Sequence, residues 1–247
     1  MLDPNTDSYK NLYCDAAGEV IGLDEVQLME PIPAERVVFL RELFASGSEY
    51  ERYQAALVLV AWNDPDIFAR LDWYLDQLMA RSGEALSPDR LHSVDTACDW
   101  VAGALSISLL NGARVETVDY YTRKLLAGVT SQYYRSGLQS LLVKTTRPVL
   151  VADLEMALRG AFEAAQQSKA ALFLEPIARV EPMLAWSLIA TLPWDPAVRP
   201  SPMFEIADAL AFIKSAESRQ YLEWLLHDQG PGVADRAAKV LSSNPPE

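Results

Sequence analysis

Apolar residues recur along most of this chain at intervals of three and four positions, which is the spacing of one face of an α-helix. The residues between them are mostly polar or charged, as on the solvent side of a packed helix. This pattern predicts helices over residues 33–46, 48–62, 65–81, 88–111, 114–128, 131–145, 148–167, 169–190, 202–214, 216–227 and 231–243. Strand-like alternation is limited to a short stretch at 19–22. We therefore predict an all-α protein.

Helix-start and helix-stop signals support several of these helices. Ser48 and Glu51 have the spacing of a capping box, in which each side chain bonds to the backbone of the other. Three further starts have a capping side chain before a proline, and two ends have a glycine: Asp64-Pro65, Ser87-Pro88, Ser201-Pro202, Gly47 and Gly112.

A short pattern occurs twice near the C-terminus. Ile206, Ala207 and Leu210 are followed 31 positions later by Ala237, Ala238 and Leu241, with the same internal spacing. A helix-turn-helix unit that recurs with this period is typical of an α-solenoid, whose units bury their apolar faces by stacking. Weaker echoes of the pattern lie at 55–59 and 170–174.

Residues 202–243 resemble the HEAT and armadillo-like repeat family. Asp228, Pro231 and Val233 match the turn and second helix of its short repeats, whereas Ala234 stands where that family has Arg, and Arg236 follows two positions later. The resemblance implies a right-handed α-solenoid, an α-α superhelix of about five helix pairs. It also implies a protein that binds others without catalysis.

The predicted organisation has four parts. Residues 1–32 form a loosely structured acidic lead-in that covers the first helix pair, with seven acidic residues against the single basic Lys10. Irregular helical repeats are expected over 33–190 and a repeat pair over 202–247. Between them, residues 191–201 belong to a proline-rich stretch that cannot be helical, which makes it the expected domain boundary.

Composition and charge narrow the classes of function. The 34 acidic and 21 basic side chains give a net charge of −13, which disfavours nucleic-acid binding and favours a basic partner, although acidity also serves solubility. No apolar run reaches the roughly 18 residues needed to span a membrane. Two cysteines and a start without signal-peptide features indicate a cytoplasmic protein, and a bacterial one is expected.

Motifs for chemistry are sparse, and we predict no catalytic, cofactor-binding or metal-binding residues. His92, Asp95 and Asp99 share one face of the predicted 88–111 helix, a set that suits a divalent metal or an acid–base pair. No second cluster of ligands accompanies them, so an exposed polar helix face is the preferred interpretation. Phosphate-binding glycine motifs and a nucleophile motif are absent from the sequence.

Basic and aromatic residues gather between Arg114 and Arg147. They suit nucleic-acid stacking or, in the interpretation preferred for so acidic a chain, neutralisation of the N-terminal segment. Trp194, in the proline-rich stretch, is expected to fill a groove between repeats or to serve as an exposed anchor. The other tryptophans are expected in the core: Trp62, Trp73, Trp100, Trp186 and Trp224.

These observations predict a non-catalytic protein-binding module, most concretely a bacterial immunity protein that neutralises a cognate basic toxin by occluding it. A scaffold or adaptor protein remains an alternative, as does a helical-repeat enzyme such as a chromophore lyase or a base-excision glycosylase. The oligomeric state is left open. The residues expected to bind the partner are Asp95, Asp99, Tyr120, Tyr133 and Trp194.

Overall fold

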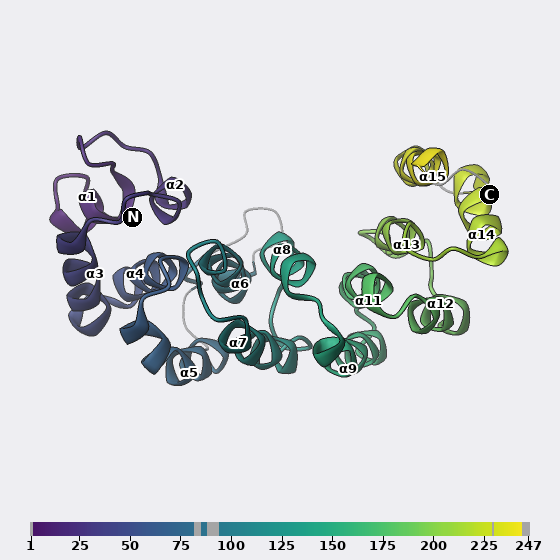
Figure 1. Ribbon diagram of the computed structural model, residues 1–247, viewed down its shortest axis with the longest axis horizontal. Coiled ribbons are helices and arrows are strands. Elements are labelled where there is room, and N and C mark those ends of the chain that lie inside the picture. The colour runs from purple at the N-terminus through teal and green to yellow at the C-terminus, as the bar shows by residue number, and fades with distance from the viewer. Residues whose placement is uncertain (1, 82–84, 88–93, 229, 244–247) are drawn as a thin grey trace. The chain divides into compact units, whose positions relative to one another are not determined.

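The computed structural model describes residues 2–81, 85–87, 94–228 and 230–243, and their regular structure is helical (Figure 1). An isolated bridge joins Cys14 and Val20, beside the predicted stretch at 19–22. The all-α prediction is confirmed. The chain divides into two compact units, with residues 1–125 and 131–141 in unit 1 and residues 126–130 and 142–247 in unit 2.

Unit 1 is built around α4, whose residues from Tyr53 to Ala61 are all buried. The neighbouring helices α3 and α6 pack against it, so α4 is covered on both sides. A helix apolar all round its circumference belongs in such a position. The helices of unit 1 are α1 (Asp7–Tyr13), α2 (Leu23–Gln27), α3 (Ala34–Ser46), α4 (Glu49–Ala61), α5 (Pro65–Met79), α6 (Ala97–Ser108), most of α7 (Val115–Ala127) and the first part of α8 (Ser136–Thr145).

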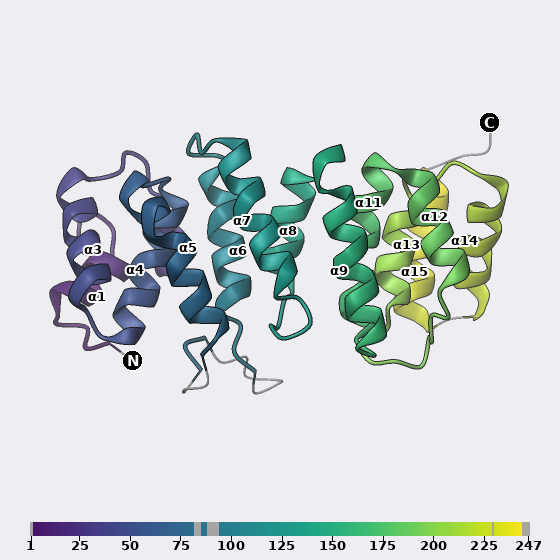
Figure 2. The ribbon, with the colours of Figure 1, turned by 90° about the horizontal axis from the view of Figure 1, so that it is seen from below.

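Unit 2 arranges its C-terminal helices in two rows, with α11, α13 and α15 in one and α12 and α14 in the other (Figure 1). Seen from the side, these helices run roughly parallel to one another along their lengths (Figure 2). The elements that lie within unit 2 are the 3-10 turn η1 (Pro148–Leu150), α9 (Val151–Glu163), α10 (Gln167–Ala171), α11 (Leu174–Val180), α12 (Pro182–Thr191), α13 (Met203–Leu210), α14 (Ala216–Asp228) and α15 (Pro231–Ser243).

Two of the predicted helix starts are confirmed in detail. The Ser48 hydroxyl accepts the amide of Glu51, and the Glu51 carboxylate accepts the amide of Ser48, which completes the capping box. Asp64 accepts the amides of Asp66 and Ile67 at the start of α5. Arg41 of α3 donates to the buried Asp64 carboxylate, so this cap also ties α5 to α3.

The predicted helix over 88–111 is wrong at its start, because α6 begins at Ala97. Asp95 accepts the amides of Ser87 and Ala97, and both the amide and the hydroxyl of Thr96 donate to the Ser87 carbonyl. Such bonds between short polar side chains and nearby backbone compete with helix formation. The Pro88 and His92 positions lie outside the described residues.

Two other predicted helices are shorter than expected. The run over 131–145 becomes helical only at Ser136, and the run over 169–190 is broken into α10, α11 and α12. Prolines account for the division of the 169–190 run, since Pro176 lies in the first turn of α11 and Pro182 opens α12. Proline has no amide hydrogen to donate and disfavours helix at the residue before it.

The N-terminal segment is more ordered than the prediction of a loose lead-in. It forms α1, which packs against α3 and α4, and α2, which packs against α4. The buried Arg36 guanidinium donates to the carbonyls of Cys14 and Asp15, and the Trp62 indole donates to the Val26 carbonyl at 3.1 Å. Contacts from helices distant in the sequence therefore hold this segment in place.

In unit 2 the two copies of the repeated pattern lie on neighbouring helices. Ile206, Ala207 and Leu210 of α13 are buried, as is Ala237 of α15, and the two helices pack together. Arg236 of α15 forms a two-pronged ion pair with Asp208 of α13. The proline-rich stretch over 191–201 lies inside unit 2, so the division between units does not fall there.

Candidate functional site

A cleft of about 580 Å³ opens in unit 1 between α2, α6 and the start of α8. Its volume lies in the range of roughly 300–1,000 Å³ typical of ligand sites. The residues that line it are Asp24, Gln27 and Leu28 from α2 and its end, Thr96, Asp99, Trp100, Gly103, Ala104 and Ile107 from α6 and its cap, and Arg135, Ser136 and Gly137 from the start of α8.

The α2 wall of the cleft combines exposed and buried side chains. Val26 faces the core and is fully buried, whereas Leu28 is 54% exposed at the end of the helix. Asp24 is exposed as a whole residue in the first turn, but partial desolvation of its carboxyl, together with the neighbouring Glu25, raises its pKa. Gln27 is only 2% exposed although it lines the cleft. This wall therefore offers an apolar edge, a carboxylate and an amide.

Asp99 joins α6 to α8 at the base of the cleft. Its Oδ1 accepts the amides of Arg135 and Leu138, at 2.8 and 2.9 Å, and its Oδ2 accepts the amide of Gly137 at 3.0 Å. The first amides of a helix have no partner within the helix, and a carboxylate there also interacts favourably with the helix dipole. Asp99 therefore acts as an N-terminal cap supplied by another helix.

Gly137 allows α6 and α8 to approach this closely, whereas Gly103, which faces it, would have room for a Cβ. A Cβ on Gly137 would lie 1.9 Å from the backbone oxygen of Asp99, a distance that no side chain can occupy. A Cβ on Gly103 would meet the Cα of Gly137 at 3.8 Å, which is ordinary contact. The hydrogen bonds of Asp99 thus depend on the absence of a side chain at position 137.

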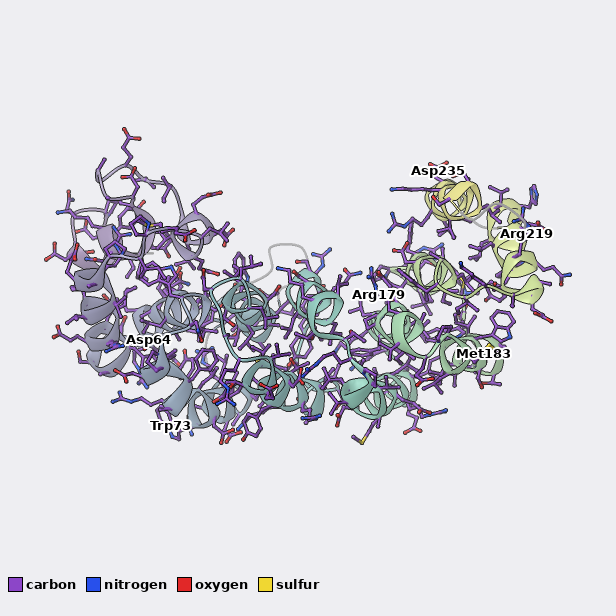
Figure 3. All side chains as sticks on the ribbon, viewed as in Figure 1. Asp64, Trp73, Arg179, Met183, Arg219 and Asp235 are labelled. Carbon is purple, nitrogen blue, oxygen red and sulfur yellow. The ribbon has the colours of Figure 1, made fainter. Side chains whose placement is uncertain are left out.

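Trp100 forms an exposed aromatic wall of the cleft, with 39% of its surface accessible. The prediction that it belongs to the core is wrong, as it is for Trp73 and Trp224, which are 52% and 37% exposed. Figure 3 shows Trp73 on the side of α5 away from α4. Only Trp62 among the predicted core tryptophans is buried in full.

Of the residues predicted to bind a partner, only Asp99 lines the cleft. It is buried, which corrects the interpretation of an exposed polar helix face. Asp95 lies ahead of α6, where it also accepts the amide of Leu86 and pairs with Arg81 at 3.2 Å. His92 lies outside the described residues. Within the ranges that are described, no three His, Cys, Asp or Glu side chains are grouped so as to hold a metal ion.

Tyr120 lies on a different surface, formed by α5 and α7. It is 52% exposed and donates its hydroxyl hydrogen to Asp72 at 2.7 Å. Lys124 pairs with Asp72 and Asp76 on the same surface. This basic residue of the 114–147 tract therefore neutralises α5, where we expected the tract to neutralise the N-terminal segment.

Tyr133 and Trp194 lie outside regular helices. Tyr133 is partly buried in the segment that leads into α8. Trp194, in unit 2, packs edge-to-face against Phe162 of α9 with ring centroids 4.9 Å apart, and its indole donates to the Leu188 carbonyl at 3.3 Å. The ring is therefore anchored on α9 and α12 and only partly accessible.

Three residues that line the cleft were not predicted to bind a partner: Gln27, Leu28 and Trp100. One signal was available for Trp100, because Gly103 and Ala104 follow it at three and four positions and leave space beside the ring. Gln27 carries no comparable signal, since α2 has only five residues and its packing depends on contacts with helices distant in the sequence. The exposure of Leu28 likewise depends on how α2 sits on α4.

Neither cysteine is placed for nucleophilic chemistry. Cys14 and Cys98 are both buried and unpaired with one another. Burial, reinforced by Asp95 and Asp99, raises the pKa of the Cys98 thiol to about 12, so it stays protonated at neutral pH. A thiol in that state is a poor nucleophile.

A second cluster of charges lies in unit 2, on α11, α13 and α15. Burial raises the pKa of Glu205 to about 7, with Asp208 and Glu175 acting in the same direction and Arg236 against it. Arg179 pairs with Glu175 at 2.6 Å and lies 4.4 Å from the centre of the Phe212 ring. The ion pair lies within α11, whereas the ring contact joins α11 to the residues that follow α13.

Glu205→Gln is expected to stabilise the protein at alkaline pH. The folded state holds the Glu205 proton more tightly than the unfolded chain, so stability falls as pH rises from 4.5 to about 7. The variant lacks this loss and should be more stable than the wild type by about 2 kcal/mol at pH 8, with little difference at pH 4.5. Urea unfolding of both proteins at both pH values measures this difference in stability. An equal difference at pH 4.5 and pH 8 would contradict the raised pKa of Glu205.

No helix in the described ranges is both long enough and apolar enough to cross a membrane. Comparison with models of known protein families, with curated proteins and with solved structures gives no match for this chain.

Proposed function

We propose that this chain is a non-catalytic protein-binding protein that holds a basic partner in the cleft between α2, α6 and α8. The observation that carries the proposal is the pairing of two accessible apolar side chains, Trp100 and Leu28, at one open cleft. Exposed tryptophan beside a hollow is a common anchor of protein interfaces. The cleft also presents the Asp24 carboxylate, which suits a cationic group.

The charge distribution favours a basic partner for this unit. Residues 1–81 carry fifteen acidic and six basic side chains, a balance of −9, and they supply most of unit 1. A field of one sign raises the rate at which an oppositely charged protein is captured. The same field repels a polyanion, so a protein partner is favoured over nucleic acid.

In its most concrete form the proposal is a bacterial, cytoplasmic immunity protein that occludes a cognate toxin. A HEAT-like arrangement of the helix pairs, which we propose here, would fit such a role, because repeat proteins present extended surfaces for binding. The resemblance over 202–243 supports that assignment of the pairs. A scaffold or adaptor would use the same cleft, and the identity of the partner separates the two functions.

The test is to capture the partner and then to alter the cleft. Wild-type protein is used to isolate a binding protein from the native host, and its affinity is measured by calorimetry against Trp100→Ala and Leu28→Ser. We expect each change to weaken binding about tenfold or more. Trp224→Ala is the matched control, since Trp224 is similarly exposed but lies in unit 2.

The outcome distinguishes the candidate functions. A basic captured protein that is toxic to cells lacking this chain supports the immunity role, and a harmless one supports the adaptor. If Trp100→Ala and Leu28→Ser bind as tightly as Trp224→Ala does, the cleft is not the binding surface and the proposal is wrong.

A further inference from the structure

Gln27 is a buried side chain with an unused hydrogen-bond donor. It is 2% exposed, and its Nε2 has no hydrogen-bond partner among the described residues. A buried amide without a partner destabilises the folded state. Nε2 itself is covered in the free protein, and because Gln27 lines the cleft, a turn of its side chain would bring this donor to an acceptor on an incoming ligand.

The rest of the lining restricts what that ligand is. Asp99 already accepts three amides at the start of α8, so its negative charge opposes an anion there. The Asp24 and Asp99 carboxylates outnumber the single guanidinium of Arg135 in the lining. A neutral acceptor beside a positive charge therefore fits the cleft better than a carboxylate or phosphate.

Apolar contacts complete the recognition surface. Trp100 presents an accessible ring, and Leu28, Ala104 and Ile107 add aliphatic surface to the same cleft. An arginine or lysine side chain can lie over an indole with its charge beside a carboxylate. The raised pKa of Asp24, caused by burial and by Glu25, means that its charged form gains from a cation placed next to it.

Building on the proposed function, we propose that the cleft binds an extended peptide segment of the partner in which a basic residue stands next to an aliphatic one. A main-chain carbonyl of the segment accepts a hydrogen bond from Gln27 Nε2. The basic side chain lies over Trp100 toward Asp24, and the aliphatic side chain contacts Ala104 and Ile107. Gln27 thus recognises the main chain of the segment, whereas Asp24 and Trp100 recognise its basic side chain.

The inference is tested with the full chain and a defined peptide, acetyl-Leu-Arg-Leu-Arg-amide. Its binding is followed by nitrogen-15 NMR of the tryptophan indoles and glutamine side-chain amides. We expect saturable shifts of the Trp100 indole and Gln27 amide signals and none of the Trp224 indole. The acidic counterpart, acetyl-Leu-Glu-Leu-Glu-amide, should cause no saturable shift.

Gln27→Met separates a binding role from a structural one. Methionine keeps the length of the side chain but removes the amide, so the dissociation constant for the basic peptide should rise about fivefold. Because the unpaired donor is also removed, the melting temperature should rise by about 2–4 °C. A fall in melting temperature would show that the amide is satisfied in the free protein and would overturn the inference.

The two proposals fail in different ways. If the captured partner binds through Trp100 and Leu28 but both peptides leave Trp100 unshifted, or shift it equally, the peptide inference is wrong and the proposed function stands. If neither the partner nor the peptide depends on the cleft, both are wrong. Weaker peptide binding by Gln27→Met together with a higher melting temperature supports the inference.

Discussion

Gly137→Ala is expected to lower the free energy of unfolding by about 3 kcal/mol or more. The new Cβ would lie 1.9 Å from the backbone oxygen of Asp99 and 2.8 Å from its carbonyl carbon. Neither atom belongs to a flexible side chain, so relief requires that α6 and α8 move apart. That movement would also stretch the three hydrogen bonds of Asp99, and urea unfolding measures the combined loss.

Gly160→Ala is the matched control, because Gly160 also lies within a helix, α9. A Cβ there would meet only the Thr130 methyl carbon, at 3.7 Å, which is normal contact. Alanine is the better helix former by about 0.5–1 kcal/mol, so this variant should be slightly more stable than the wild type. Equal effects of the two substitutions would show that α6 and α8 do not approach as described.

Asp99→Ala is the second change with a large expected effect, a loss of about 3 kcal/mol. It removes one carboxylate and leaves the amides of Arg135, Gly137 and Leu138 without their acceptor. A hydrogen bond to a charged group contributes about 1.5–3 kcal/mol, and loss of a helix cap alone costs about 1. Asp99→Asn keeps one acceptor oxygen and should lie between the alanine variant and the wild type.

Asp72→Ala is the control for Asp99→Ala, because Asp72 is also a carboxylate that accepts several hydrogen bonds. Asp72 is bonded to Tyr120 and Lys124, but its side chain is 50% exposed. Exposed ion pairs typically contribute less than about 1 kcal/mol. If Asp72→Ala destabilised the protein as much as Asp99→Ala, burial of the Asp99 cap would not be the cause of its importance.

Stability and binding are coupled at this cleft. Asp99 and Gly137 set the distance between α6 and α8, and both residues line the cleft. Variants at either position are therefore expected to disturb binding through the fold. Leu28 and Trp100 are the better probes of binding alone, because their exposed side chains contribute less to the core.

Local signals predicted the helices well where the deciding contacts are close in sequence. The capping box at Ser48 and the Asp64-Pro65 start were both correct, since their hydrogen bonds join residues two or three apart. The same kind of contact defeated the prediction for 88–111. There the side chains of Asp95 and Thr96 bond backwards to Ser87, a pairing that helical periodicity does not reveal.

Exposure was harder to predict than helix type. Trp73 shares its helix face with Arg70 and Asp76, three residues to either side, so its place on the polar side of α5 was readable in principle. Its place in a helix with apolar periodicity nevertheless favoured the prediction that the ring lies in the core. For Trp224, with Gln220 and His227 on its face, the same assignment was made and was equally wrong.

By itself, the sequence determined the helical class, most helix positions and the strong negative charge, because periodicity, caps and composition are properties of neighbouring residues or of their sum. Only the tertiary structure decided that Asp99 caps α8, that Gly137 has no room for a side chain, and that Gln27 is buried beside an open cleft. The reason is physical: the backbone groups that satisfy Asp99 lie 36 to 39 positions away, and burial depends on which distant helix covers a face.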